Sequence, residues 1–186
     1  LVWLIIGYFL GSISFGYIIG KDAGVDIVIA SLKGGLSPID KNSMAQAKVE
    51  DIETATKLLN NTQKLSDIKL DDFDGMFIPG GHGPMFDLAN SEELAKAIEY
   101  FYHSNKVISA VCHGPAGLIN AKRNDGKSIL DGKRMTSFTN KEENMSGLFN
   151  NKWYNGIDKF IMNASVNGAK LYKLCSSIKI LEVIYE

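Results

Sequence analysis

The chain has 186 residues, a formal net charge of -1, and 45% hydrophobic and 22% charged residues. These values fit one globular domain with its own core, and the near-neutral charge without a basic stripe argues against a nucleic-acid partner. The two cysteines, Cys112 and Cys175, are too few for a disulfide framework, and no His/Cys cluster has the spacing of a metal site. We therefore expect a reducing, cytoplasmic location, with no metal and no cofactor.

Residues 1–20 carry no charged side chain, and twenty apolar residues can span a membrane. Glycines at positions 7, 11, 16 and 20 repeat the small-xxx-small spacing of membrane-helix contacts. The alternative is a buried helix of an α/β domain that ends at the polar residues 21–24. We favour the buried helix, because glycines and serines dilute the hydrophobicity and no basic residues precede the run as in a signal peptide. A membrane partner is therefore not expected.

Strand-like and helix-like segments alternate along the rest of the chain. Strands are predicted at 25–31, 73–79, 106–111 and 133–138, and helices at 50–60, 91–103 and 115–121. Ser91 is placed to cap the helix over 91–103. Such alternation predicts a mainly parallel sheet with helices on both faces.

The most informative segment surrounds Cys112, which follows an apolar strand-like run. Ala110 lies two residues before the thiol and Gly114 two residues after it, as in the small-x-nucleophile-x-small pattern of a nucleophile elbow. Pro115 suits the first turn of a helix, whose positive end favours a thiolate. With His113 as an adjacent base, the pattern indicates a cysteine-dependent α/β enzyme or the remains of one.

A second His-Gly-Pro sequence, at 82–84, also follows a predicted strand. The carboxyl ends of parallel strands meet at one crevice, so both His-Gly-Pro motifs are expected to line it. Backbone N–H groups of the glycine-rich loop 80–83, with the N–H that follows Cys112, are suited to an oxyanion hole. The alternative is that this loop is only a glycine turn.

Four segments carry a family resemblance: 21–35, 74–88 with its PGGHGP sequence, 110–116 (AVCHGPA) and 132–143 (GKRMTSFTNKEE). Together they resemble the ThiJ/PfpI superfamily, and most closely its glyoxalase III-like, chaperone-associated branch within the class I glutamine amidotransferase-like fold. The resemblance runs from about residue 7 to about residue 173. It implies a flavodoxin-like three-layer α/β sandwich formed by residues 1–186 as a single domain, and a homodimer.

The resemblance also implies a site. Cys112 matches the family nucleophile, His113 the histidine that follows it, and Glu143 the acidic residue of the Cys-His-acid set, or Glu142 if the register differs by one. Backbone N–H groups of Gly81 and His113 match positions that face a developing oxyanion. The implied substrate-binding and oxyanion residues are Gly81, His82, Gly83 and Gly114.

The implied chemistry acts on small reactive aldehydes. Cys112 would attack methylglyoxal, and the hemithioacetal would rearrange and hydrolyse to lactate without glutathione or a metal, as in a glyoxalase III or D-lactate dehydratase. A deglycase-like side activity fits the same branch. The physical roles are covalent catalysis by the thiol and acid–base transfer by the imidazole.

The chain departs from the family pattern in three places. Gly11 and Ser12 stand where the family has a pair of glutamates, of which one serves as an acid/base. The family's first strand is expected before residue 1 and is not found in the chain, and residues 175–186 lack the family's C-terminal motif. These departures keep two alternatives open: a catalytically impaired chaperone-like or redox-sensing protein, and a cysteine amidase or peptidase.

Overall fold

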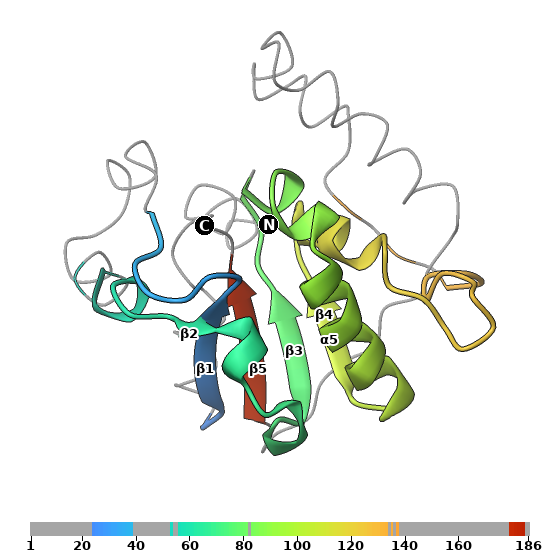
Figure 1. Cartoon of the computed structure of the whole chain (residues 1–186), viewed down its shortest axis with the longest axis horizontal. Coiled ribbons are helices and arrows are strands. Elements are labelled where there is room, and N and C mark those ends of the chain that lie inside the picture. Colours follow the sequence, from blue (N-terminus) through green and yellow to red (C-terminus); the bar gives the residue numbers. More distant parts are fainter. Residues whose placement is uncertain are drawn as a thin grey trace, which may run out of the picture.

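A five-stranded parallel sheet forms the centre of the molecule in the computed structural model, which describes residues 24–38, 56–81, 83–133 and 179–184, and residues 53, 135 and 137 singly. The strand order is β2-β1-β5-β3-β4 (Figure 1). The strands are β1 (Asp26–Ser31), β2 (Gln63–Lys64), β3 (Gly75–Ile78), β4 (Val107–Ala110) and β5 (Lys179–Ile184). All four pairings are parallel, which confirms the predicted α/β class.

Strand β5 comes from the last residues of the chain and lies between β1 and β3. All six of its residues pair with β1, from Asp26 with Lys179 to Ser31 with Ile184, and part of it also pairs with β3. In a flavodoxin-like sheet the strand order is 2-1-3-4-5. With β1, β3 and β4 as strands 2, 3 and 4 of that order, β5 lies between strands 2 and 3, which is the place of strand 1. The sequence alone had not identified this strand.

The sheet changes its direction of winding at β5. The chain runs outward from β1 to β2 on one side of β5, and then crosses to β3 and β4 on the other side. Ligands of open parallel sheets bind beyond the carboxyl ends of the strands at such a switch point. The loops after β3 and β4, for which the crevice is predicted, begin at this edge of the sheet.

Helix α5 (Glu92–His103) connects β3 to β4, within the range predicted for it. The Ser91 side chain accepts a hydrogen bond from the Leu94 N–H at 3.0 Å, which satisfies one of the free donors of the first turn. At the other end, Asn105 adopts a positive φ of 55°. Lys106 N–H donates to the Phe101 carbonyl and Asn105 N–H to the Tyr102 carbonyl, which is a Schellman cap.

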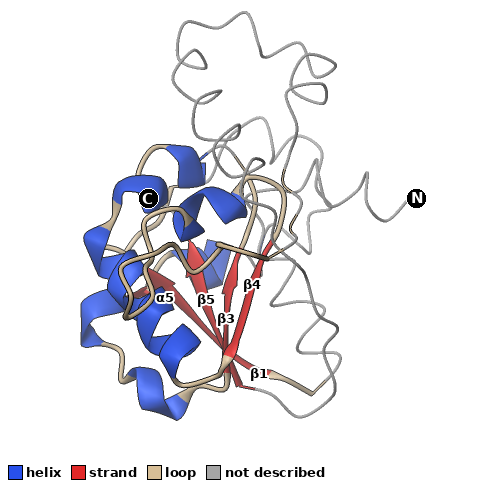
Figure 2. Ribbon diagram, turned by 90° about the vertical axis from the view of Figure 1, so that its right-hand side faces the viewer, coloured by secondary structure: helices blue, strands red, loops and turns tan. Residues whose placement is uncertain are grey.

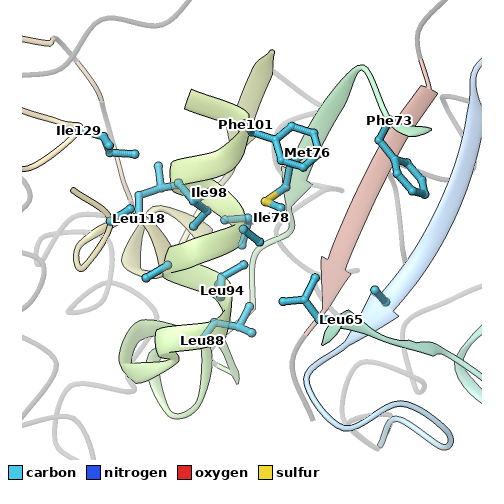
Figure 3. Close-up of a cluster of buried hydrophobic side chains, with 14 of the residues drawn as sticks. Leu65, Phe73, Met76, Ile78, Leu88, Leu94, Ile98, Phe101, Leu118 and Ile129 are labelled. Carbon is cyan, nitrogen blue, oxygen red and sulfur yellow. The ribbon is translucent and has the colours of Figure 1, made fainter. Parts of the chain in front are cut away.

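The main core lies between α5 and the sheet (Figures 2 and 3). Met76 and Ile78 of β3 are buried against apolar residues of one face of α5, namely Leu94, Ile98 and Phe101. Burial of a large apolar side chain contributes roughly 1.5–3 kcal/mol relative to exposure. This packing fixes β3, and with it the loop that begins at Pro79.

Two predicted elements differ from the structure. The strand predicted at 133–138 is not formed at its described residues: the Lys133 N–H closes a turn onto Leu130, and the Ser137 hydroxyl donates to the Cys112 carbonyl in the turn after β4. The helix predicted at 115–121 is a 3-10 helix, η5 (Gly114–Leu118). Of the helix predicted at 50–60, the described residues 53 and 56–59 are helical.

No helix in the described part of the chain combines the length and the apolar character that a bilayer crossing requires. The segment 1–20, predicted as a buried helix with a membrane span as the alternative, lies outside the described residues.

The central position of β5 predicts a large effect of proline at Leu181, which pairs with Val28 of β1 and Met76 of β3. Proline removes a backbone donor from a strand that is hydrogen-bonded on both sides. We expect Leu181→Pro to lower the free energy of unfolding by at least about 1–3 kcal/mol, the cost of leaving the backbone partner unsatisfied, measured by urea denaturation.

Asn124→Pro is the matched control. Asn124 is the second residue of a turn that the Gly126 N–H closes onto the Arg123 carbonyl at 2.9 Å, and proline is favoured at that position. A Leu181→Pro protein as stable as Asn124→Pro would contradict the placement of β5 inside the sheet.

Candidate active site

Cys112 occupies a strained turn between β4 and η5. Its φ is 58°, in the left-handed region that residues other than glycine seldom adopt, while His113 has φ -90° and ψ -8°. The Gly114 N–H donates to the Val111 carbonyl at 2.8 Å, so the four residues have the φ pattern of a type II′ turn. A left-handed conformation costs an L-residue roughly 1–2 kcal/mol. The predicted nucleophile elbow is therefore present.

Two glycines permit the close packing of this elbow. A Cβ at Gly80 would lie 2.5 Å from the Cβ of Cys112 and 3.3 Å from its Sγ. A Cβ at Gly114 would lie 2.3 Å from the Ile78 carbonyl oxygen. Real Cβ atoms do not approach other heavy atoms so closely, so both positions require glycine while the loop after β3 and the turn after β4 stay in contact.

The thiol and the imidazole form a pair. Cys112 Sγ lies 3.3 Å from His113 Nδ1, within hydrogen-bonding distance for sulfur. His113 is only 1% exposed, whereas Cys112 is partly exposed. The arrangement places a buried imidazole beside the thiol, at a distance suited to proton transfer from sulfur.

The helix that follows the elbow is shorter than predicted. Hydrogen bonds from Ala116 N–H to the His113 carbonyl and from Ile119 N–H to the Ala116 carbonyl give it 3-10 geometry. Gly114 and Gly117 lower the α-helical propensity, and Gly117 packs closely on Leu94 of α5. A five-residue helix has a small dipole, so His113 is the stronger partner for a thiolate here.

The four residues predicted to line the crevice lie in different local structures. Gly81, with φ 91°, directly follows the glycine that touches Cys112, and Gly83 begins the short helix η3 (Gly83–Met85). His82 lies outside the described residues. Among the substrate-binding and oxyanion residues Gly114 stays a prediction, and its buried N–H donates to the Val111 carbonyl within the turn. Its role is to allow the elbow to pack.

The acidic member of the predicted set, Glu143 or Glu142, lies outside the described residues, as do Gly11 and Ser12. The structure adds Ser137, whose hydroxyl donates to the Cys112 carbonyl at 3.0 Å. The sequence had placed Ser137 within a family-like segment, but no local pattern indicated a contact with a residue 25 positions earlier. Within the described ranges, no three His, Cys, Asp or Glu side chains gather as a metal site.

An open parallel sheet with a cysteine on a sharp turn at its carboxyl edge defines a flavodoxin-like α/β protein. Residues 16–172 match the DJ-1/PfpI family, and the chain belongs to that family. This confirms the resemblance drawn from the sequence motifs.

Similar proteins include the glutathione-independent glyoxalase hsp3102 of Schizosaccharomyces pombe, which is 32% identical over 144 residues, covering 71% of this chain and 60% of the relative. The structure of Rapid Encystment Protein 24 KDa of Francisella tularensis aligns with a TM-score of 0.73 and 31% identity, over 91% of this chain and 75% of that one. Glyoxalase III from Candida albicans aligns with a TM-score of 0.70 and 24% identity, over 96% and 80%, and shows the fold. The chain spans about 60% of the length of the first curated relatives it matches.

The close contact at Gly80 predicts that Gly80→Ala displaces the Cys112 side chain from His113. We expect the rate constant for alkylation of Cys112 by iodoacetamide to fall at least about tenfold, because reactivity depends steeply on the placement of the reacting atoms. Gly117→Ala is the control, since its Cβ would meet chiefly side-chain carbons such as Leu94 Cδ2, at 3.1 Å. Equal alkylation rates in two folded variants would contradict this reading of the contact.

Proposed function

We propose that the chain carries the active site of a glutathione-independent glyoxalase that converts methylglyoxal to lactate through Cys112. The observation that carries the proposal is the Cys112–His113 pair, with Sγ and Nδ1 3.3 Å apart on a strained elbow. The name of the Schizosaccharomyces pombe relative, a glutathione-independent glyoxalase, supports the substrate class.

The first step would be addition of the thiol to the aldehyde carbon of methylglyoxal. His113 Nδ1 takes the thiol proton as sulfur bonds to carbon, and the aldehyde oxygen receives a proton to give a hemithioacetal. The N–H groups of Gly81 and His113 are the proposed donors to the oxygen as its negative charge develops. No electrons leave or enter the system in this step.

The second step would move a proton from the former aldehyde carbon to the ketone carbon. A base removes the proton from the carbon that carries sulfur, the resulting enediol is protonated on the neighbouring carbon, and the product is a lactoyl thioester of Cys112. Water then cleaves the thioester and restores the thiol. The sum is methylglyoxal plus water to lactate, which requires no oxidant, metal or glutathione.

Three further residues enter the proposal from the sequence. Glu143 would orient the His113 imidazole, as the acid of a nucleophile-base-acid set does. Gly11 and Ser12 replace the carboxylate expected to carry the proton in the second step. A positioned acid–base group contributes typically 10²- to 10⁴-fold, so the turnover of this chain would be slow unless His113 takes over the transfer.

The same replacement favours a second candidate function. A cysteine with a paired histidine but without the second acid–base group can oxidise reversibly without turning over an aldehyde, as in a redox-sensing or chaperone-like protein. An amidase or peptidase needs the same pair, but no observation selects it.

The proposal also includes a homodimer, a cytoplasmic location, and a second helical layer that would complete a three-layer sandwich.

The test is production of D-lactate from methylglyoxal without glutathione. We expect the wild-type protein to form D-lactate, Cys112→Ala to form none above the uncatalysed rate, and Ser12→Glu to exceed the wild type about tenfold or more if it restores an acid–base group. Each variant should keep the wild-type melting temperature.

Three outcomes separate the candidates. Wild-type turnover equal to that of Cys112→Ala would defeat the glyoxalase proposal. A gain confined to Ser12→Glu would identify the replaced carboxylate as the defect. Reversible oxidation of Cys112 by hydrogen peroxide without lactate formation would instead support the redox-sensing protein.

A further inference from the structure

The sequence contains three steps in which glycine follows aspartate, at 74–75, 125–126 and 131–132. Such a step is prone to ring closure, because glycine has no side chain to hinder attack of its nitrogen on the aspartate carboxyl group. Gly75 is buried in β3, where a Cβ would lie 3.2 Å from the Val107 Cβ. Gly126 and Gly132 are exposed, and no described atom beyond the adjacent residues lies within 4 Å of a Cβ built on either. Two of the steps therefore have the space that the reaction needs.

The first exposed step lies at the tip of a short hairpin, residues 121–129. The ends of the hairpin are joined by the Ile129 N–H, which donates to the Ala121 carbonyl at 3.1 Å. Nearer the tip, the Arg123 N–H donates to the Lys127 carbonyl at 2.7 Å, and the Gly126 N–H donates to the Arg123 carbonyl at 2.9 Å. Gly126 has φ 77°, which glycine adopts without strain. The hairpin thus holds the aspartate before Gly126 next to Arg123.

The Arg123 guanidinium contacts the aspartates of both exposed steps. Its Nε lies 3.2 Å from Asp125 Oδ1 and its Nη2 lies 3.1 Å from Asp125 Oδ2, which is a fork on one carboxylate. The same Nη2 lies 3.2 Å from Asp131 Oδ2. Asp125 Oδ1 also accepts from the Lys127 N–H at 3.1 Å. Both aspartate side chains are 52% exposed, so the number of contacts, and not burial, distinguishes them.

The fork bears directly on the chemistry of ring closure. A protonated carboxyl group can lose water when nitrogen attacks it, whereas an ionised carboxylate would have to expel an oxide ion. The hydrogen bonds from Arg123 and then from the Lys127 N–H lower the pKa of Asp125. At any pH above that pKa, a lower value leaves a smaller fraction of the side chain protonated. The contact with Arg123 therefore reduces the reactive form of Asp125.

We propose that isoaspartate forms at Asp131–Gly132, and that the Arg123 fork protects Asp125–Gly126 from the same reaction. The glycine nitrogen bonds to the aspartate Cγ, its proton and the carboxyl hydroxyl leave as water, and a succinimide ring results. Water then opens the ring at either carbonyl and yields aspartate or isoaspartate, without an oxidant or another reactant. Isoaspartate adds a methylene group to the main chain, which at the hairpin tip would disturb the hydrogen bond between Gly126 and Arg123.

The experiment follows isoaspartate in the folded protein during storage at mildly acidic pH. Mass spectrometry of the peptides with electron-transfer fragmentation assigns isoaspartate to each step separately. In the wild type we expect about twofold or more isoaspartate at Asp131 than at Asp125, because one contact stands where the other has a fork. We expect Arg123→Gln to raise the rate at Asp125 by about twofold or more. The buried step at Gly75 is the internal reference and should stay unmodified.

Lys122→Gln is the matched control. Lys122 is an exposed residue of the same hairpin, and its replacement removes the same unit of charge. The structure describes both aspartates, and Lys122 forms an ion pair with neither. We expect the wild-type rates in this variant. A rate at Asp125 that is equal in Arg123→Gln and Lys122→Gln would overturn the proposal, as would wild-type isoaspartate at Asp125 equal to or above that at Asp131.

A second measurement separates the fork from the closure of the hairpin. Amide hydrogen exchange at Gly126 reports whether the hairpin stays closed, because this N–H donates to the Arg123 carbonyl. We expect its protection to persist in Arg123→Gln. Isomerisation and amide exchange that rise by the same factor would show an opened hairpin and overturn the role of the fork.

If Arg123→Gln does not fold, Arg123→Lys makes the same comparison, because lysine keeps the charge without the fork. A rate at Asp125 in Arg123→Lys equal to that of the wild type then overturns the proposal. These outcomes do not depend on whether Cys112 turns over an aldehyde, so the proposed function is tested separately.

Discussion

Strand β5 joins the two halves of the sheet. In the described part of the chain, β1 and β2 lie on one side of β5 and β3 and β4 on the other. The two pairs of strands are connected across the sheet through the hydrogen bonds that β1 and β3 each make with β5. Because β5 is paired on both sides over several residues, the two halves have a fixed register. The loops at the carboxyl ends of β1 and β3 are therefore placed relative to one another by a segment distant from both in the sequence.

Within one half of the sheet, the register of β3 and β4 places the Cys112 thiol. Ile78 pairs with Ala110, and two residues beyond this pair stand Gly80 on one strand and Cys112 on the other. The two residues are thus brought into contact by the ladder itself. A slip of one residue would put Pro79 or Gly81 against the thiol instead. The small residue after β3 is therefore as much a part of the elbow as the glycine after Cys112.

Local patterns in the sequence were sufficient to predict several strands, a helix cap and the turn at Cys112. The strands over β1, β3 and β4, the cap at Ser91 and the elbow at Cys112 each depend on residues that are close in the chain, and the structure confirms them. Hydrophobic runs, a capping residue and small flanking residues carry such information directly.

The features that the sequence did not reveal depend on distant contacts. The segment of β5 has a short apolar run, but its place depends on pairing with β1 and β3, which no local pattern encodes. The contact of Ser137 with Cys112 likewise follows from how a loop returns to the elbow. The 3-10 form of η5 reflects its two glycines and its packing on α5, which outweighed the proline signal for a longer helix.

The position of β5 also bears on how the protein folds. Asp26 pairs with Lys179, so most of the chain lies between the two partners of one ladder. Long-range pairing of this kind slows folding, because the entropy of closing the intervening chain is lost before the contacts form. Until β5 enters, β1 and β3 each present an open edge to which a strand of another molecule can add. The strand that completes the sheet is thus also the one whose delay would expose the newly made chain to aggregation.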